Sequence, residues 1–365
     1  MKRLLLLLTT LSLFTAARAF SFSATAPTGQ TLYFTVTSAT EVKVVPPAAV
    51  DWDGYAAPVG RLQIPATVTD NGVTYTVTAI DRMAFAKCYG LTAVTIPGSV
   101  VSIGMRAFVE DTMLTRAVLA EGVERIDMMA FLACSALDTI ELPTTLTRIA
   151  VSAFEGTAFY SNADNWNDYM LVLGQWALKV GNLVAGGVTV PEGIVGLANS
   201  AFLYCRYMDR VDLPSTLRYV GEGTFNSCEV LDTVQVRAEV PPDITDDSFL
   251  GIPVPATLVV PCGRVAAYEA AEYWNAFDVV EDSCHTGIDR VEPKRPCVVV
   301  LHDGIEVRGA EGSELTLCDI MGRRLCTVRR AAASQRLPLP LPTVGVYILR
   351  IDGSAMKIMK TGYCR

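Results

Sequence analysis

A phenylalanine recurs at a fixed spacing through the middle of this chain, and that spacing limits what the chain can fold into. It recurs every 23 residues at Phe85, Phe108, Phe131 and Phe154 and again at Phe202 and Phe225, with Phe249 24 residues later. A period of this length is typical of stacked repeat architectures. One such unit cannot bury its apolar face, but stacked copies share a continuous core, with strands about 4.8 Å apart. The spacing therefore predicts a solenoid.

The same residue types recur around each phenylalanine. An aliphatic residue stands five positions earlier, at Ile80, Ile103, Ile126, Ile149, Leu197, Val220 and Ile244. An alternating apolar run follows each phenylalanine, and proline ends that run at Pro97, Pro143, Pro191, Pro214 and Pro261. Each unit is predicted to be a short strand ended by proline, then a turn, then a compact apolar segment around Ala-Phe. The longer gap after Phe154 predicts an insertion at about residues 159–187 and a degenerate turn closed by residues 188–191.

The segments that flank the repeats have different sequence patterns. Residues 20–78 lack the period but contain predicted strands at 32–37 and 41–45 and a hairpin turn at Asp70-Asn71-Gly72. They are expected to form an N-terminal β cap, because the ends of a solenoid need covering. The repeat domain, residues 79–280, is expected to close with a strand and a short helix at 265–274.

The last part of the chain is predicted to be a separate domain. Residues 281–296 are polar and end in proline, which is typical of a linker. Residues 297–365 contain short β segments separated by glycine turns, which predicts a small β-sandwich.

The first nineteen residues have the features of an export signal. Lys2 and Arg3 precede an apolar run of eleven residues, and Ala17-Arg18-Ala19 forms a small-x-small cleavage site. The run is shorter than the about 20 residues that span a bilayer, so no transmembrane helix is expected once the signal is removed. The first cysteine is Cys88, so lipid attachment at the mature N-terminus is not expected either. We predict export to the cell surface, the outer membrane or the extracellular medium.

The charge of the mature chain is unfavourable for nucleic acid. Without the signal, 27 basic residues face 38 acidic ones, a net charge of −11. Residues 20–296 carry −15 of this and residues 297–365 carry +4. An acidic body repels phosphate backbones and anionic membrane surfaces, so neither is an expected partner.

The repeat unit resembles the BspA-like leucine-rich repeat of bacterial cell-surface proteins. The resemblance rests on "VVSIGMRAF", "TLTRIAVSAF" and "TLRYVGEGTFNSCEVLDTV" and covers about residues 79–280. It implies a β-rich α/β fold, a right-handed leucine-rich-repeat solenoid with a strand-lined face, which this family commonly uses for adhesion or protein binding. The sequence departs from the pattern where Ala120 and Arg237 replace the strand-ending proline, and where Asp111, Thr157 and Ile252 replace a cysteine.

Residues 297–365 resemble the C-terminal sorting domain of type IX secretion cargo. The likeness rests on residues 304–307, 319–323 and 345–350 and on Lys357. It implies recognition by the secretion machinery, passage across the outer membrane, and removal when the cargo is fixed to the surface. The final residues after Lys357 and the prolines before Gly345 depart from that pattern.

The repeat domain lacks the residues of the common catalytic and metal sites. The only two histidines, His285 and His302, lie outside it, which excludes a Ser-His-Asp or Cys-His site and a histidine-based zinc site there. We expect a non-enzymatic protein with no cofactor and no metal. A carboxylate-based glycosidase, which needs no histidine, is kept as a third possibility; Asp243, Asp246 and Asp247 form its densest cluster, although they are better interpreted as a solvated loop.

Two surfaces are candidates for binding. If Val94 and Ile96 point inward, alternation along the strands and the repeat period place a row of other side chains on the outer face. The predicted surface consists of Arg116, Thr139, Glu141, Arg210, Asp212 and Gln235. Its mixed charge and lack of aromatics suit contact with proteins of a host matrix or of neighbouring cells, or plain solvated surface. Trp166 and Trp176 in the insertion form a secondary candidate that would bind glycan, or else fill an irregular turn.

The cysteines fall into two groups. Cys88, Cys134, Cys205 and Cys228 all lie three residues after a repeat phenylalanine. Because aspartate, threonine and isoleucine also occupy this position, it is interpreted as a packing position, although Lys87 beside Cys88 allows a reactive-thiol interpretation. Cys262 and Cys284 are predicted to form a disulfide that joins the closing helix to the array; sequence alone leaves other pairings open.

Overall fold

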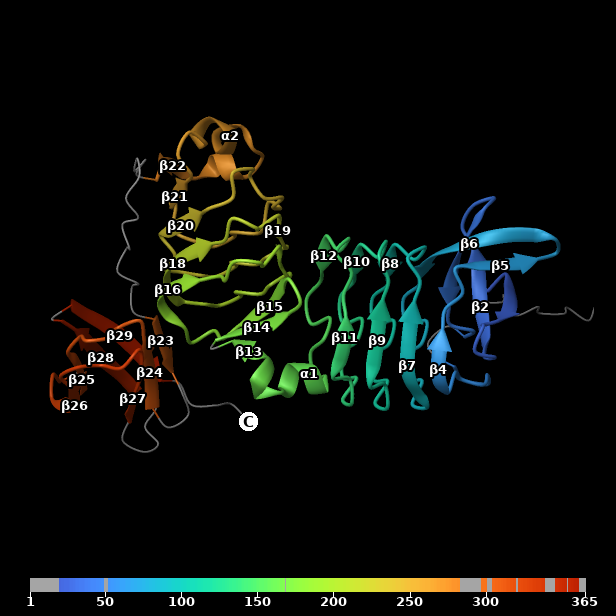
Figure 1. The fold of residues 1–365 in the computed structure, drawn as a ribbon, viewed down its shortest axis with the longest axis horizontal. Coiled ribbons are helices and arrows are strands. Elements are labelled where there is room, and N and C mark those ends of the chain that lie inside the picture. The colour runs from blue at the N-terminus through green and yellow to red at the C-terminus, as the bar shows by residue number, and fades with distance from the viewer. Residues whose placement is uncertain are drawn as a thin grey trace, which may run out of the picture.

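The predicted solenoid is confirmed. The computed structural model describes residues 20–48, 52–167, 169–282, 297–300, 304–319, 321–338, 345–352 and 354–360. Each coil has three sides: a longer strand in what we call the face sheet, a short strand in the back sheet, and the segment around its phenylalanine, which we call the Phe side. The coils form two arrays that run in different directions (Figure 1).

The first array contains two parallel sheets. Its face sheet has the order β11-β9-β7-β4 and consists of β4 (Gly60–Gln63), β7 (Leu91–Ile96), β9 (Arg116–Leu119) and β11 (Thr139–Glu141). Its back sheet continues from β6 (Val73–Ile80) through β8 (Ser102–Ile103), β10 (Arg125–Ile126) and β12 (Arg148–Ile149). The short strands turn toward the Phe side immediately after their buried isoleucine.

The N-terminal strands continue the back sheet outward. They are β1 (Phe22–Thr25), β2 (Thr31–Val36), β3 (Glu41–Val45) and β5 (Thr67–Asp70). The β5-β6 hairpin has a two-residue turn in which Asn71 and Gly72 have positive φ values of 47° and 79°, as Asn-Gly hairpin turns require. Gln30 blunts the exposed edge of β4 by donating to the carbonyls of Val59 and Arg61 at 2.9 and 2.8 Å.

The first coil begins earlier than the phenylalanine spacing indicated. β4 pairs in parallel with β7, so the face sheet starts inside the segment predicted to be only a cap. The stretch "RLQIP" has the strand-and-proline pattern of a repeat, and Leu62 and Ile64 are buried. Its coil lacks the phenylalanine, whose place in the core is taken by Trp52, stacked on Phe85 with ring centroids 6.3 Å apart.

The repeat phenylalanines stack as two columns. In the first array the centroids of Phe85, Phe108, Phe131 and Phe154 are 5.0, 4.9 and 5.4 Å apart. The second column contains Phe202, Phe225 and Phe249, spaced 4.7 and 4.8 Å apart, and Trp274 packs against its end. Phe154 and Phe202 belong to different hydrophobic clusters, so each array has a core of its own.

Backbone hydrogen bonds join the coils along the Phe side. In the coil of Phe85, the N–H groups of Met83, Phe85 and Lys87 donate to carbonyls of the next coil at 3.1, 2.8 and 2.9 Å. The coils of Phe108 and Phe131 repeat this set of three bonds. The residues two before and two after each repeat phenylalanine from Phe85 to Phe225 have positive φ, for example 56° at Met83 and 62° at Lys87. This alternation turns every second N–H group toward the next coil.

The insertion divides the solenoid instead of lying within one array. It contains α1 (Ala158–Ser161), η1 (Ala163–Asn165), β13 (Trp166–Asn167), β14 (Met170–Leu173) and β15 (Trp176–Val180). β14 and β15 form an antiparallel hairpin, and β15 pairs in parallel with β17 (Gly196–Leu197). The hairpin thus occupies the place beside β17 that β12 would hold in a continuous array. The predicted degenerate turn is β16 (Ala185–Thr189), which starts a new face sheet.

The second array repeats the architecture of the first. Its face sheet consists of β16, β18 (Tyr207–Leu213), β20 (Thr233–Val236), β21 (Thr257–Val260) and β22 (Asp278–Glu281), and its back sheet ends with β19 (Tyr219–Val220). The predicted closing helix is shorter than expected. α2 (Val265–Ala270) ends because Ala271 is extended, with φ −80° and ψ 135°, and η2 (Trp274–Ala276) follows Tyr273, which has a left-handed φ of 65°.

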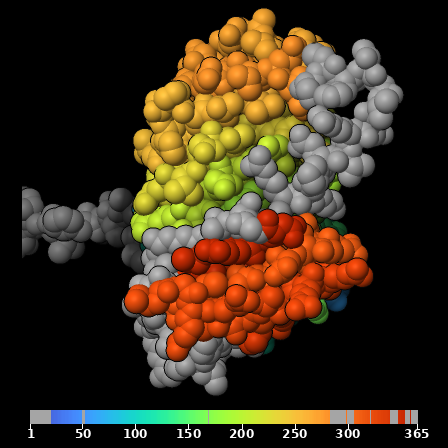
Figure 2. Space-filling model, turned by 90° about the vertical axis from the view of Figure 1, so that its left-hand side faces the viewer, coloured from blue at the N-terminus to red at the C-terminus, as the bar shows by residue number. Residues whose placement is uncertain are grey.

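The C-terminal strands pack as two antiparallel sheets that share a core. One contains β23 (Cys297–Val300), β24 (Gly304–Arg308) and β27 (Ser334–Pro338), and the other contains β25 (Leu315–Asp319), β26 (Arg324–Val328), β28 (Gly345–Ile351) and β29 (Ser354–Lys360). β23 also pairs antiparallel with β16, with Ala185 opposite Val298. These strands therefore extend the face sheet of the second array and lie directly against its coils (Figure 2).

Candidate binding surface

The strand pairing reproduces the predicted register of the outer face. Ala93 lies opposite Arg116, which lies opposite Thr139, and the neighbouring row joins Val118 to Glu141. Val94 and Ile96 point into the core and are fully buried. In the second array Arg210 pairs with Thr233, and Asp212 with Gln235. The six predicted residues therefore lie on face sheets, three in each array.

The face of the first array keeps its charged groups in water. Arg116 and Glu141 form an ion pair across adjacent strands, and their side chains are 50% and 51% exposed. Thr139 donates through Oγ1 to Asp138 Oδ1 at 3.0 Å. An exposed ion pair of this kind contributes about 0–1 kcal/mol to stability, so both side chains can turn toward a partner at small cost.

The face of the second array is closed by its own contacts. Arg210 Nε donates to Asp212 Oδ1 at 2.7 Å, and these side chains are only 16% and 19% exposed. Arg210 also donates to Gln235, whose Nε2 donates to Asp282 Oδ2 at 3.0 Å. Gln235 is 9% exposed, so it does not lie on an open surface as the sequence predicted. The alternation pattern did not reveal Asp282, which lies 47 residues away in the chain.

The aromatic residues of the insertion are largely used in packing. Trp176 is 3% exposed, and its ring stacks on Tyr219 with centroids 6.2 Å apart. Gly196 lies so close that a Cβ there would come within 2.4 Å of the Trp176 ring. Trp166 is half-buried, donates through Nε1 to the carbonyl of Tyr160 at 3.0 Å, and meets the Tyr160 ring edge-on. Trp176 therefore cannot stack on a ligand at the surface.

The repeated cysteine position is a packing position in the structure. Cys88, Cys134, Cys205 and Cys228 are free and buried. Burial raises the pKa of the Cys88 thiol, with a smaller contribution from Asp111, which disfavours the reactive thiolate. Cys134 donates through Sγ to the carbonyl of Phe108 at 2.9 Å.

Asp111 occupies the cysteine position of its coil and is fully buried. Its Oδ1 accepts from the backbone N–H of Cys88 at 2.7 Å, whereas Oδ2 has no hydrogen-bond partner among the residues that the structure describes. Burial raises the pKa of this carboxyl, an effect that the hydrogen bond from Cys88 opposes.

The remaining predicted residues lie elsewhere. Cys262 is disulfide-bonded, and Cys284, its predicted partner, lies outside the described residues. Asp247 accepts through Oδ1 from the Thr245 hydroxyl at 2.7 Å.

Within the described parts of the chain, no group of three or more His, Cys, Asp or Glu side chains is arranged to hold a metal ion. No helix in those parts is long and apolar enough to cross a membrane.

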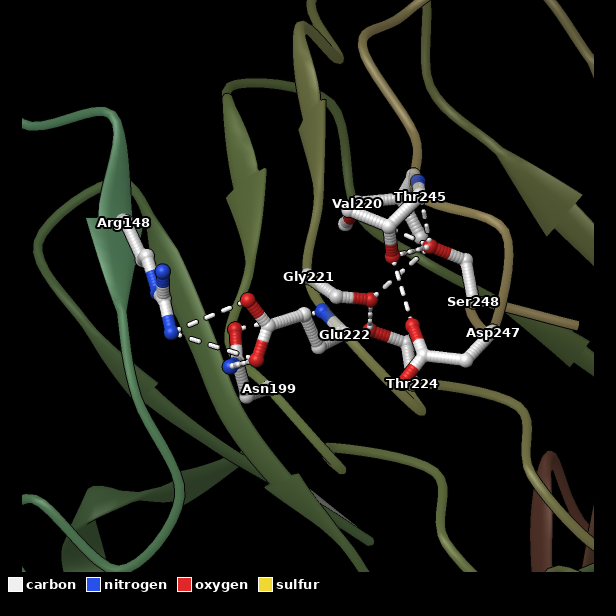
Figure 3. Close-up of polar contacts among 9 residues, drawn as sticks. All are labelled: Arg148, Asn199, Val220, Gly221, Glu222, Thr224, Thr245, Asp247 and Ser248. Atoms are coloured by element: carbon white, nitrogen blue, oxygen red, sulfur yellow. Dashed lines mark hydrogen bonds and ion pairs between the residues drawn. The ribbon is translucent and has the colours of Figure 1, made fainter. Parts of the chain in front are cut away.

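A polar contact at the junction of the two arrays did not appear in the sequence pattern. Arg148, at the end of the first array, reaches Glu222 in the second at 2.9 Å (Figure 3). Glu222 also accepts from Asn199 Nδ2 at 3.0 Å. In the same region the hydroxyls of Thr224 and Ser248 donate to the carbonyl of Gly221 at 2.7 and 3.1 Å. These two residues replace the alanine that precedes phenylalanine in the other coils.

Comparison with known proteins identifies the repeat. The model of the BspA type leucine-rich repeat region matches residues 67–167 and 183–253, in six copies. No curated protein sequence matches this chain significantly.

Three solved structures show similarity to parts of the chain. A leucine-rich repeat protein from Bacteroides capillosus is 30% identical over 36% of this chain and 91% of its own, with a TM-score of 0.32. A leucine-rich cell-surface protein from Faecalibacterium prausnitzii is 17% identical over 73% and 96%, with a TM-score of 0.26. A pneumococcal vaccine antigen is 12% identical over 72% and 99%, with a TM-score of 0.19.

Proposed function

The repeat region of this chain is of the BspA leucine-rich type, and on that premise we propose that the protein is a non-enzymatic surface protein that binds proteins of a host matrix or of neighbouring cells. Binding occurs through the face sheet of the first array. A solenoid offers an extended, preformed surface, so affinity is spread over many modest contacts. The predicted export signal at residues 1–19 agrees with a location outside the cytoplasm.

The observation that carries this proposal is the open row of side chains on β4, β7, β9 and β11. Arg61, Gln63, Thr95, Arg116 and Glu141 are all exposed on this sheet, and strand pairing holds them in fixed register. The row mixes both charges and contains no aromatic ring, which suits a polar protein surface better than a sugar. Arg210, Asp212 and Gln235 are not part of the proposed contact, because the Arg210 side chain is hydrogen-bonded to both Asp212 and Gln235.

The C-terminal strands carry the proposed route to the surface. We propose that residues 297–365 act as the sorting signal that the secretion machinery recognises, as their resemblance to type IX cargo implies. The paired antiparallel sheets over the described part of this segment are compatible with the predicted β-sandwich. Deleting residues 297–365 and testing intact cells for protease-accessible protein examines this point: loss of surface protein is expected, and undiminished display would contradict it.

Glycan binding through the insertion remains the second candidate. Trp166 keeps part of its ring exposed, whereas Trp176 is buried. This function would be favoured if polysaccharide columns retain the protein but do not retain the Trp166→Ala variant. The third candidate is a carboxylate-based glycosidase, for which no catalytic carboxylate pair is assigned. Hydrolysis of any glycoside by the protein would favour this function.

A matched pair of charge reversals tests the protein-binding proposal. Arg116→Glu and Arg206→Glu remove equally exposed arginines, since Arg206 is 52% exposed and pairs with Glu229. Only Arg116 lies on the face sheet. In binding assays on immobilised matrix proteins and on neighbouring bacterial cells, Arg116→Glu should weaken binding about tenfold, which corresponds to about 1.4 kcal/mol. Arg206→Glu should leave binding unchanged, and equal behaviour of the two variants would reject the proposal.

A further inference from the structure

The last coil of the first array has backbone N–H groups that find no acceptor in the described part of the chain. By the repeat register, Ser152, Phe154 and Gly156 correspond to the residues that donate to the next coil elsewhere on the Phe side. Ser152 and Gly156 have the same left-handed conformation, with φ values of 56° and 74°. Their N–H groups and that of Phe154 therefore point away from the preceding coil. Among the described residues, no carbonyl accepts from any of the three.

The hairpin of the insertion explains this break. By register, the carbonyl of Ala201 would accept from Phe154, but it accepts from Val180 N–H in β15 at 2.7 Å. The two coils still meet at one corner, where Asn199 N–H donates to the carbonyl of Ile149 at 2.9 Å. Beyond this bond the coils separate. The N–H groups of Ser152, Phe154 and Gly156 therefore face an opening instead of a neighbouring coil.

A small cavity lies at this opening. Its volume is about 90 Å³, and its lining includes Ser152, Phe154, Glu155, Lys179 and Ser200. Water takes up about 30 Å³ per molecule in the liquid, so the cavity has room for a group of only a few heavy atoms. It is open to one side, because Glu155 is exposed.

Hydrogen-bond donors predominate in the cavity, and its lining carries one charge of each sign, from Lys179 and from the exposed Glu155. Besides the N–H groups, it presents the hydroxyls of Ser152 and Ser200 and the side chain of Lys179. Lys179 makes no ion pair with any described residue. At the rim, the carboxylate of Glu222 is already engaged by Arg148 and Asn199. Of the three residues, Phe154 is buried, and a buried N–H group without a partner costs about 1–3 kcal/mol, which a bound acceptor would recover.

From these observations we propose that the junction cavity binds a carboxylate, whether of a small free acid or of an acidic side chain or chain end of a peptide. Its two oxygens accept from the N–H groups of Ser152 and Phe154, and Lys179 neutralises its charge. Charge-assisted bonds of this kind are about twice as strong as neutral ones. The site is independent of the proposed face sheet, because it lies on the Phe side at the junction of the arrays.

The test uses the mature chain with acetate and glutarate, with acetamide as the uncharged isostere, and with short peptides that have acidic or amidated ends. Amide resonances of Ser152 and Phe154 should shift with the carboxylates and not with acetamide. Lys179→Met should weaken this binding about tenfold or more, whereas Lys87→Met, an exposed lysine on the same side, should not. Binding of free acids identifies a small-molecule source, and binding of acidic peptides alone identifies a protein source.

A second measurement does not depend on a variant. In the free protein, hydrogen exchange at Ser152 and Phe154 should be at least about 100-fold faster than at Met129 and Phe131, whose N–H groups are bonded to the next coil. A saturating carboxylate should slow the exchange. Exchange that is equally slow in both coils, or an identical response to acetate and acetamide, would overturn the proposal and leave the cavity as a water site.

Discussion

The two arrays share one repeat but present different faces. In the first array, Arg116 and Glu141 keep half of their side-chain surface in water. In the second, Arg210 and Asp212 are held in a network with Gln235 and Asp282, and β23 covers the edge at β16. The repeat pattern alone therefore does not decide whether a face is free to bind. What flanks each array decides it.

The arrays also differ in how they fill the same core positions. One cysteine position of the first array holds a buried aspartate, Asp111, beside Cys88 and Cys134 in other coils, whereas in the second array the thiol of Cys228 donates to the carbonyl of Phe202 at 3.3 Å. The alanine position holds hydroxyl residues only in the second array, where they satisfy carbonyls at the turn. Among the described residues, buried side-chain polar atoms are thus paired in the second array and incompletely paired in the first.

The largest expected effect concerns the separate cores. Phe108→Ala should lower the free energy of unfolding of the first array by about 3–5 kcal/mol, because it opens a cavity in a closely stacked column. Phe225→Ala should do the same in the second array. Because the two columns lie in different clusters, hydrogen exchange should accelerate mainly in the mutated array. Equal acceleration in both arrays would show that the solenoid unfolds as one unit.

A smaller effect is expected from Asp111→Cys. Because burial raises the pKa of Asp111, the contribution of this group to stability is fully present below the unfolded value of about 3.9 and is lost as the pH rises through the folded value. Urea unfolding at neutral pH should therefore show the variant to be more stable by about 1–3 kcal/mol. The gain should shrink toward acidic pH, and a gain that does not depend on pH would contradict this assignment. The reverse exchange, Cys228→Asp, should destabilise the second array.

The smallest effect is expected at the junction. Glu222→Gln removes the charge that Arg148 contacts but retains a carbonyl oxygen for Asn199. Both charged side chains are more than 40% exposed, so the loss of stability should be at most about 1 kcal/mol. A loss of several kcal/mol in thermal or urea unfolding would mean that this contact, rather than the hairpin, holds the arrays together.

Sequence periodicity predicts the strand register within the repeats, but it does not predict the structure of segments that lack the repeat. The pairing of Ala93 with Arg116 and of Arg210 with Thr233 follows from the 23-residue spacing, because each coil adds one rung in the same register. The β14-β15 hairpin has no periodic counterpart, so it was predicted only as an insertion. The burial of Gln235 depends on Asp282, and the joining of β23 to β16 depends on strands distant in sequence. Such contacts leave no local signal.

Footprinting of the bound protein tests the central claim most directly. The mature chain would be labelled by hydroxyl radicals, free and bound to the immobilised partner that it retains in the binding assays. Protection should appear on β4, β7, β9 and β11, around Arg61, Arg116 and Glu141, while β18 and β20 keep the same labelling in both states. Protection of β18 and β20 with no change on the first array would contradict the account.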